Sequence, residues 1–152
     1  MTWTTQNVVQ DGGAILASQK VLASLRSADF NTTADQPLVL PSAVTALIVS
    51  QIIVTNASTS LTTARGGFYP GALKQSPPIV DPSQSYAVLT GPTIYMNPFL
   101  STYGQTTRFS STNLPLVLSS NNQYALSFYL SLTVPQGTPA TADVYIVGID
   151  LS

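Results

Sequence analysis

The feature that most constrains this chain is its lack of the residues that build exposed helices. Among its 152 residues there is no Glu, and Lys is present at two positions, Lys20 and Lys74. Thr, Val, Ile, Tyr and Phe are frequent instead, and they suit the pleated, half-buried surface of a strand. Eleven Pro and nine Gly interrupt the chain at short intervals, as turns do between short strands. We therefore expect an all-β protein.

The clearest strand signal is the alternation of apolar and polar residues over positions 124–133. Leu126, Phe128 and Leu130 point to one face, and the intervening residues point to the other. Residues 46–55 are apolar on both faces, which predicts a central strand. Residues 14–26 permit either a helix or a strand, and we favour a strand over 21–31. Further strand-like stretches are expected at residues 36–40, 64–69, 79–80, 86–89, 93–100, 107–110, 116–118 and 142–151.

These strands predict one domain with two packed sheets. About eight antiparallel strands over residues 21–152 favour a single jelly-roll β-sandwich, and an immunoglobulin-like sandwich is the alternative. Trp3, the single Trp, lies outside this region, so the core Trp of an immunoglobulin-like fold is missing. Residues 1–13 have no clear period, and Asp11-Gly12-Gly13 has the composition of a turn or hinge. We therefore expect residues 1–20 to form an N-terminal arm.

The composition excludes most catalytic chemistry. The chain has no His and no Cys, so it has no disulfide, no thiolate or imidazole ligand for a metal, and no His to act as a general base. Asp143 and Asp150 fall in one expected strand, seven residues apart, where we expect two solvated surface carboxylates and no paired acid and base. We expect no enzyme, no cofactor and no metal site.

One polar segment resembles the first half of a calcium-binding loop. Oxygen-bearing side chains occur at every second position, in Asp29, Asn31, Thr33 and Asp35. The pattern then fails, because Leu40 stands where the loop needs a bidentate Glu. The segment is better interpreted as a polar turn in which Asp and Asn side chains accept hydrogen bonds from the backbone.

Charge also excludes two classes of partner. The net charge is −1 and the five basic residues are scattered, so no basic stripe is present for nucleic acid or anionic lipid. The most apolar run, residues 46–54, is far shorter than the roughly 20 residues of a transmembrane helix. Residues 1–6 have neither a basic region nor an apolar run, so we expect no signal peptide and synthesis in the cytoplasm.

Aromatic residues are the best candidates for a binding surface. Seven of them fall between positions 68 and 109: Phe68, Tyr69, Tyr86, Tyr95, Phe99, Tyr103 and Phe109. Such side chains fill a sandwich core, line a protein interface or form a platform for a glycan. The candidate interface residues are Tyr95, Phe99 and Tyr103 in this region and Trp3, Val8 and Val9 in the arm.

Several blocks of the sequence are similar to a known group of proteins. They are FNTTADQ at 30–36, IIVTNAS at 52–58, SLTTARGGFY at 60–69, YAVLT at 86–90 and ATADVY at 140–145. Over about residues 21–150 the chain resembles small jelly-roll proteins encoded among the virion structural genes of tailed bacteriophages. The resemblance implies a virion component that contains no catalytic motif.

Two functions are compatible with this resemblance. The first is a capsid decoration (cement) protein on the capsid surface, which binds the major capsid protein and copies of itself and stabilises the head shell. The alternative is the receptor- or glycan-binding head domain of a tail fibre or spike. The scarcity of charge favours an assembled protein in either case, because few ions would lose their water when its surface is buried.

Overall fold

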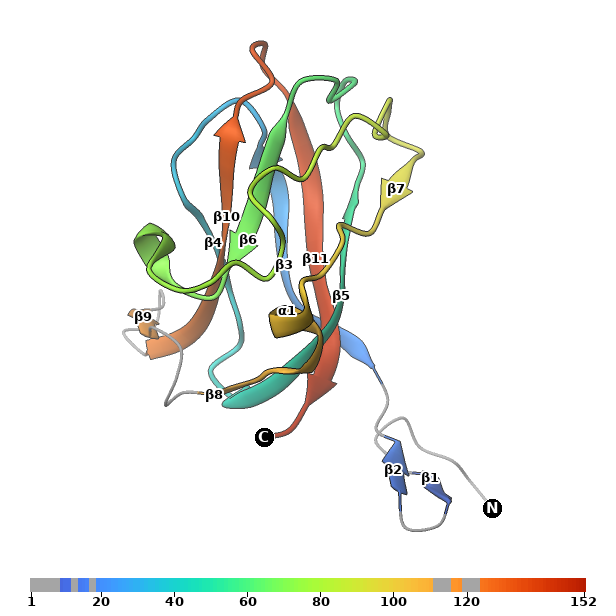
Figure 1. Ribbon diagram of the computed structural model, residues 1–152, viewed down its shortest axis with the longest axis vertical. Helices are drawn as coiled ribbons and strands as arrows, with labels where there is room; N and C mark the ends of the chain where they lie inside the picture. Colours follow the sequence, from blue (N-terminus) through green and yellow to red (C-terminus); the bar gives the residue numbers. More distant parts are fainter. Residues whose placement is uncertain (1–8, 12–13, 17–18, 111–115, 119–123) are drawn as a thin grey trace.

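Two antiparallel sheets face each other and enclose an apolar core (Figure 1). The computed structural model describes residues 9–11, 14–16, 19–110, 116–118 and 124–152. Every strand pairing within these residues is antiparallel. The expectation of an all-β protein is therefore confirmed.

The larger sheet is built around β11 (Thr141–Asp150), which lies between β3 (Lys20–Asp29) and β5 (Ala46–Thr55). Two short strands share the other edge of β5. β7 (Tyr95–Met96) pairs with its end, and β8 (Arg108–Ser110) pairs with its start. Because β5 has neighbours on both edges, its sequence, apolar on both faces apart from Ser50 and Gln51 at its centre, is the expected one for a central strand.

The second sheet is built around β10 (Tyr124–Val134), which lies between β4 (Gln36–Val39) and β6 (Arg65–Tyr69). β9 (Leu116–Leu118) pairs with the first residues of β10. Consecutive strands from β3 to β6 thus alternate between the two sheets.

An irregular segment, residues 79–86, extends the second sheet beyond β6. Val80 forms a bridge with Phe68, and Ser85 forms one with Arg65. The segment passes so close to β6 that a Cβ atom on Gly67 would come within 2.2 Å of the Val80 carbonyl oxygen. Gly67 is therefore required for this approach.

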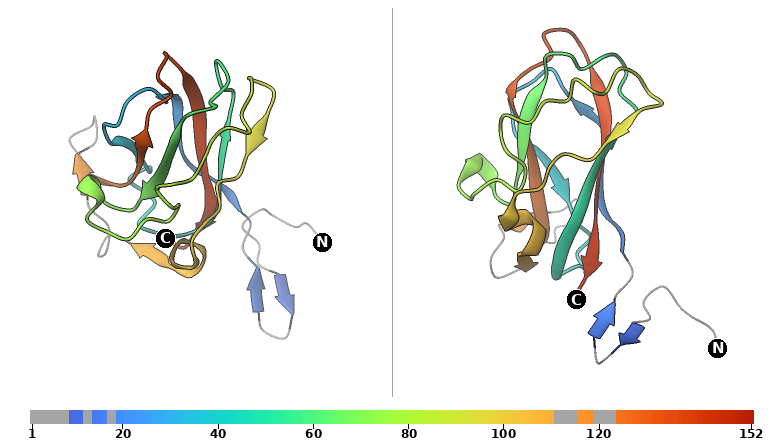
Figure 2. Two further views of the ribbon diagram at one scale, coloured as in Figure 1. Left: turned by 45° about the horizontal axis from the view of Figure 1, so that its top comes forward. Right: turned by 45° about the vertical axis from the view of Figure 1, so that its right-hand side comes forward.

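The alternation predicted for residues 124–133 is confirmed on the core face of β10. Leu126, Phe128, Leu130 and Leu132 are all buried. Ser127 and Ser131, on the opposite face, are buried as well. The loop that contains the 3-10 helix η1 (Ala72–Lys74) lies on the side of this sheet that is turned away from the core (Figure 2).

The N-terminal region contains a hairpin. β1 (Val9–Asp11) pairs with β2 (Ala14–Leu16), and no other strand in the described part of the chain pairs with either. The hairpin lies away from the sandwich, beyond the start of β3 (Figure 1). The helical interpretation of residues 14–26 is wrong, since β2 and β3 occupy this stretch.

Three local expectations need correction. Residues 86–89 form a turn, closed by a hydrogen bond from Leu89 N to Tyr86 O (2.9 Å), because the Tyr86 ring is drawn into the core. Strand structure in 93–100 is limited to β7 and an isolated bridge at Leu100. The five-residue helix α1 (Thr102–Thr106) was not expected; the Ser101 side chain caps it by accepting a hydrogen bond from Gly104 N.

Candidate interaction surface

Two of the candidate aromatic residues lie on the surface. Tyr95 is 67% exposed and Phe99 is 78% exposed. Both belong to the segment beside β5, where Asn97 fixes the backbone by donating hydrogen bonds to Gln51 Oε1 (2.9 Å) and Ile52 O (3.1 Å). Tyr95 pairs with Thr55 in the register of β7 and β5. The segment thus holds two large rings in solvent on a fixed backbone.

Tyr103 has a different environment. It lies in α1, half-buried, with its ring edge-to-face against Phe109 at a centroid distance of 5.7 Å. Phe109 in turn contacts Phe128 of the opposite sheet in the same geometry, at 5.2 Å. Tyr103 is therefore part of the packing at the edge of the core.

The other aromatic residues of this region fill the interior. Phe68, Tyr69, Tyr86 and Phe109 are all buried. Burial raises the pKa of Tyr86, so its hydroxyl stays protonated and donates a hydrogen bond to Gly66 O at 3.1 Å. Most of the seven aromatic rings in this region therefore pack in the core. Tyr95 and Phe99 are the two whose exposure permits contact with a partner.

Sequence patterns did not predict several other exposed apolar side chains, among them Leu73 (76% exposed), Val88 (57% exposed) and Val21 (56% exposed). Leu73 and Lys74 both have positive φ, 58° and 57°, which is unfavourable for residues with a side chain. A hydrogen bond from Leu73 N to Asp35 Oδ2 (3.0 Å) holds this turn against the segment before β4. The one sequence signal for the exposure of Leu73 was its position as an isolated Leu in a loop rich in Pro and Gly.

The arm residues are harder to place. Trp3 and Val8 lie outside the described residues. Val9 begins β1, and the backbone alone of that strand is described. Their proposed role in an interface therefore stays a prediction.

Among the residues with described side chains, the carboxylates do not form an acidic site, because each one is hydrogen-bonded to the backbone. The five aspartates whose side chains are described each accept a hydrogen bond from a backbone N–H: Asp29 from Asn31, Asp35 from Leu73, Asp81 from Ser83, Asp143 from Ser27 and Asp150 from Ser152. For the segment 29–35 this confirms the interpretation as a polar turn. In the part of the chain with described side chains, no three His, Cys, Asp or Glu residues group to hold a metal ion.

The expectation that Asp143 is a solvated carboxylate is wrong. Its residue is 3% exposed, and it accepts hydrogen bonds from Ser27 N (2.7 Å), Arg26 Nε (3.1 Å) and Asn56 Nδ2 (3.0 Å). Burial raises the pKa of Asp143, but these three donors outweigh it, and the pKa is lowered overall. The error has a physical cause: a register shift between β11 and β3 brings Arg26 and Ser27 to this position.

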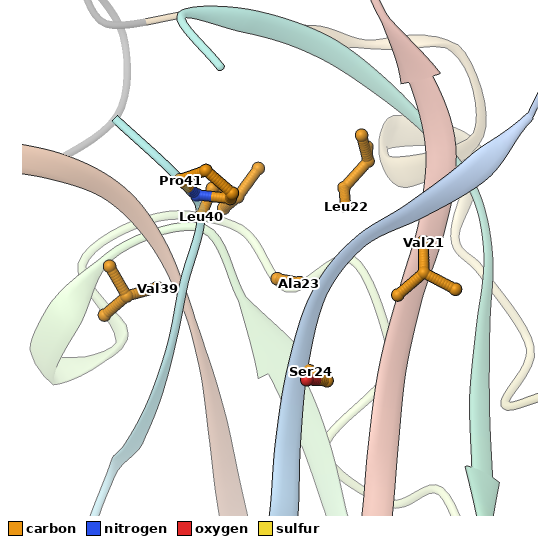
Figure 3. Close-up of a pocket in the computed structure, with 7 residues that line it drawn as sticks. All are labelled: Val21, Leu22, Ala23, Ser24, Val39, Leu40 and Pro41. Atoms are coloured by element: carbon orange, nitrogen blue, oxygen red, sulfur yellow. The ribbon is translucent and has the colours of Figure 1, made fainter. Parts of the chain in front are cut away.

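A shallow groove of about 380 Å³ runs between the two sheets on one side of the sandwich. It is lined by residues 21–24 of β3 and residues 39–41 at the end of β4 (Figure 3). Leu22, Ala23 and Leu40 are buried beneath it, while Val21 and Val39, 56% and 37% exposed, point away from it on the outer faces of the two sheets (Figure 3). The groove contains no charged side chain.

Within the described residues, no helix is long and apolar enough to cross a membrane. Comparison of the chain with protein-family models, with curated proteins and with solved structures found no match. Functional conclusions therefore depend on the surface described above and on the chemistry of the sequence.

Proposed function

We propose that the chain is a structural protein of a bacteriophage virion, a capsid decoration protein that binds the head shell and stabilises it. The observation that carries this proposal is the exposure of large apolar side chains, above all Tyr95 and Phe99, on a body with few ions. The centres of protein interfaces are enriched in aromatic residues and depleted of charge. A surface of this kind can be buried against a shell with little desolvation of charged groups.

We also propose that the sandwich is a single jelly roll. The support is the strand order: β11 lies between β3 and β5, and β10 lies between β4 and β6, with consecutive strands alternating between the sheets. Residues 79–86 would supply the fourth strand of the second sheet, beside β6. Viral capsid domains use this architecture, and the sequence blocks similar to phage virion proteins fall within it.

The second candidate is the head domain of a tail fibre or spike that binds a receptor or glycan. It is favoured by the same two rings, because an exposed aromatic side chain offers an apolar face for a sugar together with, in Tyr95, a polar hydroxyl. The number of copies of the chain in each virus particle distinguishes the two functions. A decoration protein covers the shell, whereas fibres are few.

The direct test is the number of copies in purified virions of the phage that encodes the chain. Quantitative mass spectrometry against the major capsid protein would give the ratio of the two chains. A decoration protein is expected at a fixed ratio comparable to that of the capsid subunits. A handful of copies per particle would support the fibre function, and absence from the virion would contradict both.

A further inference from the structure

Residues 70–78 leave the second sheet at the end of β6 and then return to it; we call this segment the strap. Ile79 N donates a hydrogen bond to Phe68 O (2.8 Å), so both ends of the strap meet at β6. Between its ends, Leu73 N donates a hydrogen bond to Asp35 Oδ2 (3.0 Å), directly before β4. Because β10 lies between β6 and β4, this bond draws the strap across the outer face of β10, the side on which Figure 2 shows it.

The strand register locates the crossing on β10. Tyr69 lies opposite Tyr129, and Gln36 lies opposite Leu130, so the strap crosses β10 close to Tyr129 and Ser131. Both of these side chains belong to the outer face, since side chains alternate along a strand and Leu130 between them faces the core. Ser131 is nevertheless fully buried, and Tyr69 is 6% exposed. The strap therefore covers this part of the outer face.

The polar groups beneath the strap are poorly satisfied. Ser131 Oγ has no hydrogen-bond partner within the described residues. Burial and the negative charges of Asp81 and Asp35 raise the pKa of Tyr69, whose hydroxyl thus lies near two carboxylates and stays protonated. A buried hydroxyl without a partner is unfavourable, and it regains hydrogen bonds when water reaches it. Removal of the strap would allow this solvation.

The backbone of the strap is strained in its closed position. Leu73 and Lys74 have φ values of 58° and 57°, in the left-handed region where a Cβ atom crowds the following carbonyl oxygen. Leu73 is 76% exposed, so core packing of its side chain does not compensate for this strain. Strained backbone persists only where its surroundings hold it in place. At this turn the hydrogen bond from Leu73 N to Asp35 does so.

We infer that the strap is a lid over the outer face of the second sheet, with Asp35 as its latch. Opening relaxes the strained turn, lets water reach Ser131 and exposes the rings of Tyr69 and Tyr129. The sandwich stays intact, because no strand pairing or bridge in the described part of the chain includes a strap residue. Segments with few bonds to their surroundings open at a lower free energy than the whole domain. This inference does not depend on a role in the virion.

A cysteine beneath the strap tests the lid, because the chain has no Cys of its own. Ser131→Cys places a thiol at a fully buried position with little change in size. An aromatic disulfide reagent in excess labels the thiol when it is exposed, and the labelling rate is measured at urea concentrations below the unfolding transition. Because the effect of urea scales with the surface exposed, a local opening should show a weak dependence on urea. A rate that rises with urea as steeply as global unfolding does would overturn the lid.

The latch is tested in the same Ser131→Cys background. Asp35→Ala removes the acceptor of the Leu73 N–H, and we expect labelling to be about tenfold faster for the loss of one hydrogen bond to a charged group. Leu73→Gly relieves the strain of the closed strap and should slow labelling about threefold. The control is Asp29→Ala, whose carboxylate bonds to Asn31 N and not to the strap, and it should leave the rate unchanged. Equal rates for the two aspartate variants, or faster labelling with Leu73→Gly, would contradict the latch.

Limited digestion with trypsin gives a second measurement without a cysteine. Lys74 lies in the strap, whereas Arg65 lies in β6. Asp35→Ala should speed cleavage after Lys74 about tenfold and leave cleavage after Arg65 and the urea midpoint nearly unchanged. Unchanged cleavage after Lys74 would overturn the inference. Equal acceleration at both sites would show global destabilisation and would overturn it as well.

Discussion

At the scale of single residues, Asp143 joins the three long strands of the larger sheet. It belongs to β11, accepts hydrogen bonds from Arg26 and Ser27 of β3, and accepts one from Asn56 directly after β5. Ser27 and Asn56 both have a φ of 55°, in the left-handed region that favours glycine. The carboxylate thus compensates for two strained backbone positions by bonding to each of these residues.

Removing this carboxylate should destabilise the protein. In Asp143→Ala, the Ser27 N–H, the Asn56 amide and the Arg26 guanidinium lose their shared acceptor in a part-buried network, which we expect to cost about 1–3 kcal/mol of unfolding free energy. The matched control is Asp29→Ala, whose carboxylate accepts one hydrogen bond at an exposed position and whose loss should cost less than about 1 kcal/mol. Urea denaturation measures both. Equal losses would show that burial of Asp143 has no special effect.

The lowered pKa of Asp143 also predicts how the stability of the folded protein depends on pH. The pKa values of Asp143 and Asp150 are lowered in the folded protein from their ordinary value of 3.8. Their stabilisation is therefore complete above that value and is lost as the pH falls through the lower, folded pKa values. With no His and no Cys, the melting temperature should be flat between about pH 6 and 8 and should fall below about pH 4. A marked change between pH 6 and 8, measured by circular dichroism, would contradict this account.

At the scale of secondary-structure elements, β10 is the strand on which the core depends most. Leu130 is fully buried between Phe128 and Leu132 on the core face. Leu130→Ala should leave a cavity and cost about 2–5 kcal/mol of unfolding free energy. Val134→Ala, near the exposed end of the same strand, should cost less than about 1 kcal/mol. A loss below about 1 kcal/mol for Leu130→Ala would show that this face is not packed.

The long strands could be predicted from the sequence, and the short elements could not. Residues 46–55 are the bounds of β5 as predicted, and β10 and β11 differ from prediction by one residue at their ends. In these strands burial imposes a period on ten or more residues. The conformation of residues 86–89 depends on contacts of Tyr86 with distant residues: its ring packs edge-to-face on Phe30, and its hydroxyl donates a hydrogen bond to Gly66 O. The local sequence does not indicate these contacts.

The candidate surface was predictable only in part, for a related reason. Tyr95, Phe99 and Tyr103 are similar in sequence context, yet the first two are exposed and the third packs on Phe109. Which ring is buried depends on the position of α1, a five-residue helix whose only sequence signal is its Ser101 cap. Exposure of Leu73 depends likewise on a hydrogen bond to Asp35, 38 residues away.

The arm should be separable from the sandwich. Because β1 and β2 pair only with each other among the described strands, deletion of residues 1–16 removes no described strand pairing of either large sheet. We expect the truncated chain to melt within a few degrees of the full-length chain while losing self-association. Thermal melting and sedimentation velocity test the two parts. Unfolding of the truncated chain would show that the sandwich needs the arm.

At the scale of the whole molecule, the described surface combines few unpaired charges with large exposed apolar side chains. Its described carboxylates are all bonded to backbone, and two of its basic side chains, Lys20 and Arg26, form ion pairs with Asp150 and Asp143. Large apolar side chains at Tyr95, Phe99, Leu73 and Val88 occupy the exposed positions instead. Such a surface favours association through apolar contact, which depends little on salt or on pH near neutrality.

The most direct test of the proposed decoration function is binding to empty capsids of the proposed phage. Purified protein would be mixed with the capsids at micromolar concentration, sedimented, and quantified in the pellet, with the melting temperature of the capsid measured in parallel. The account predicts saturable binding at a fixed ratio to capsid subunits, a higher capsid melting temperature, and weaker binding for Phe99→Ser than for Val88→Ser. A protein that stays in the supernatant and leaves the capsid melting temperature unchanged would contradict it.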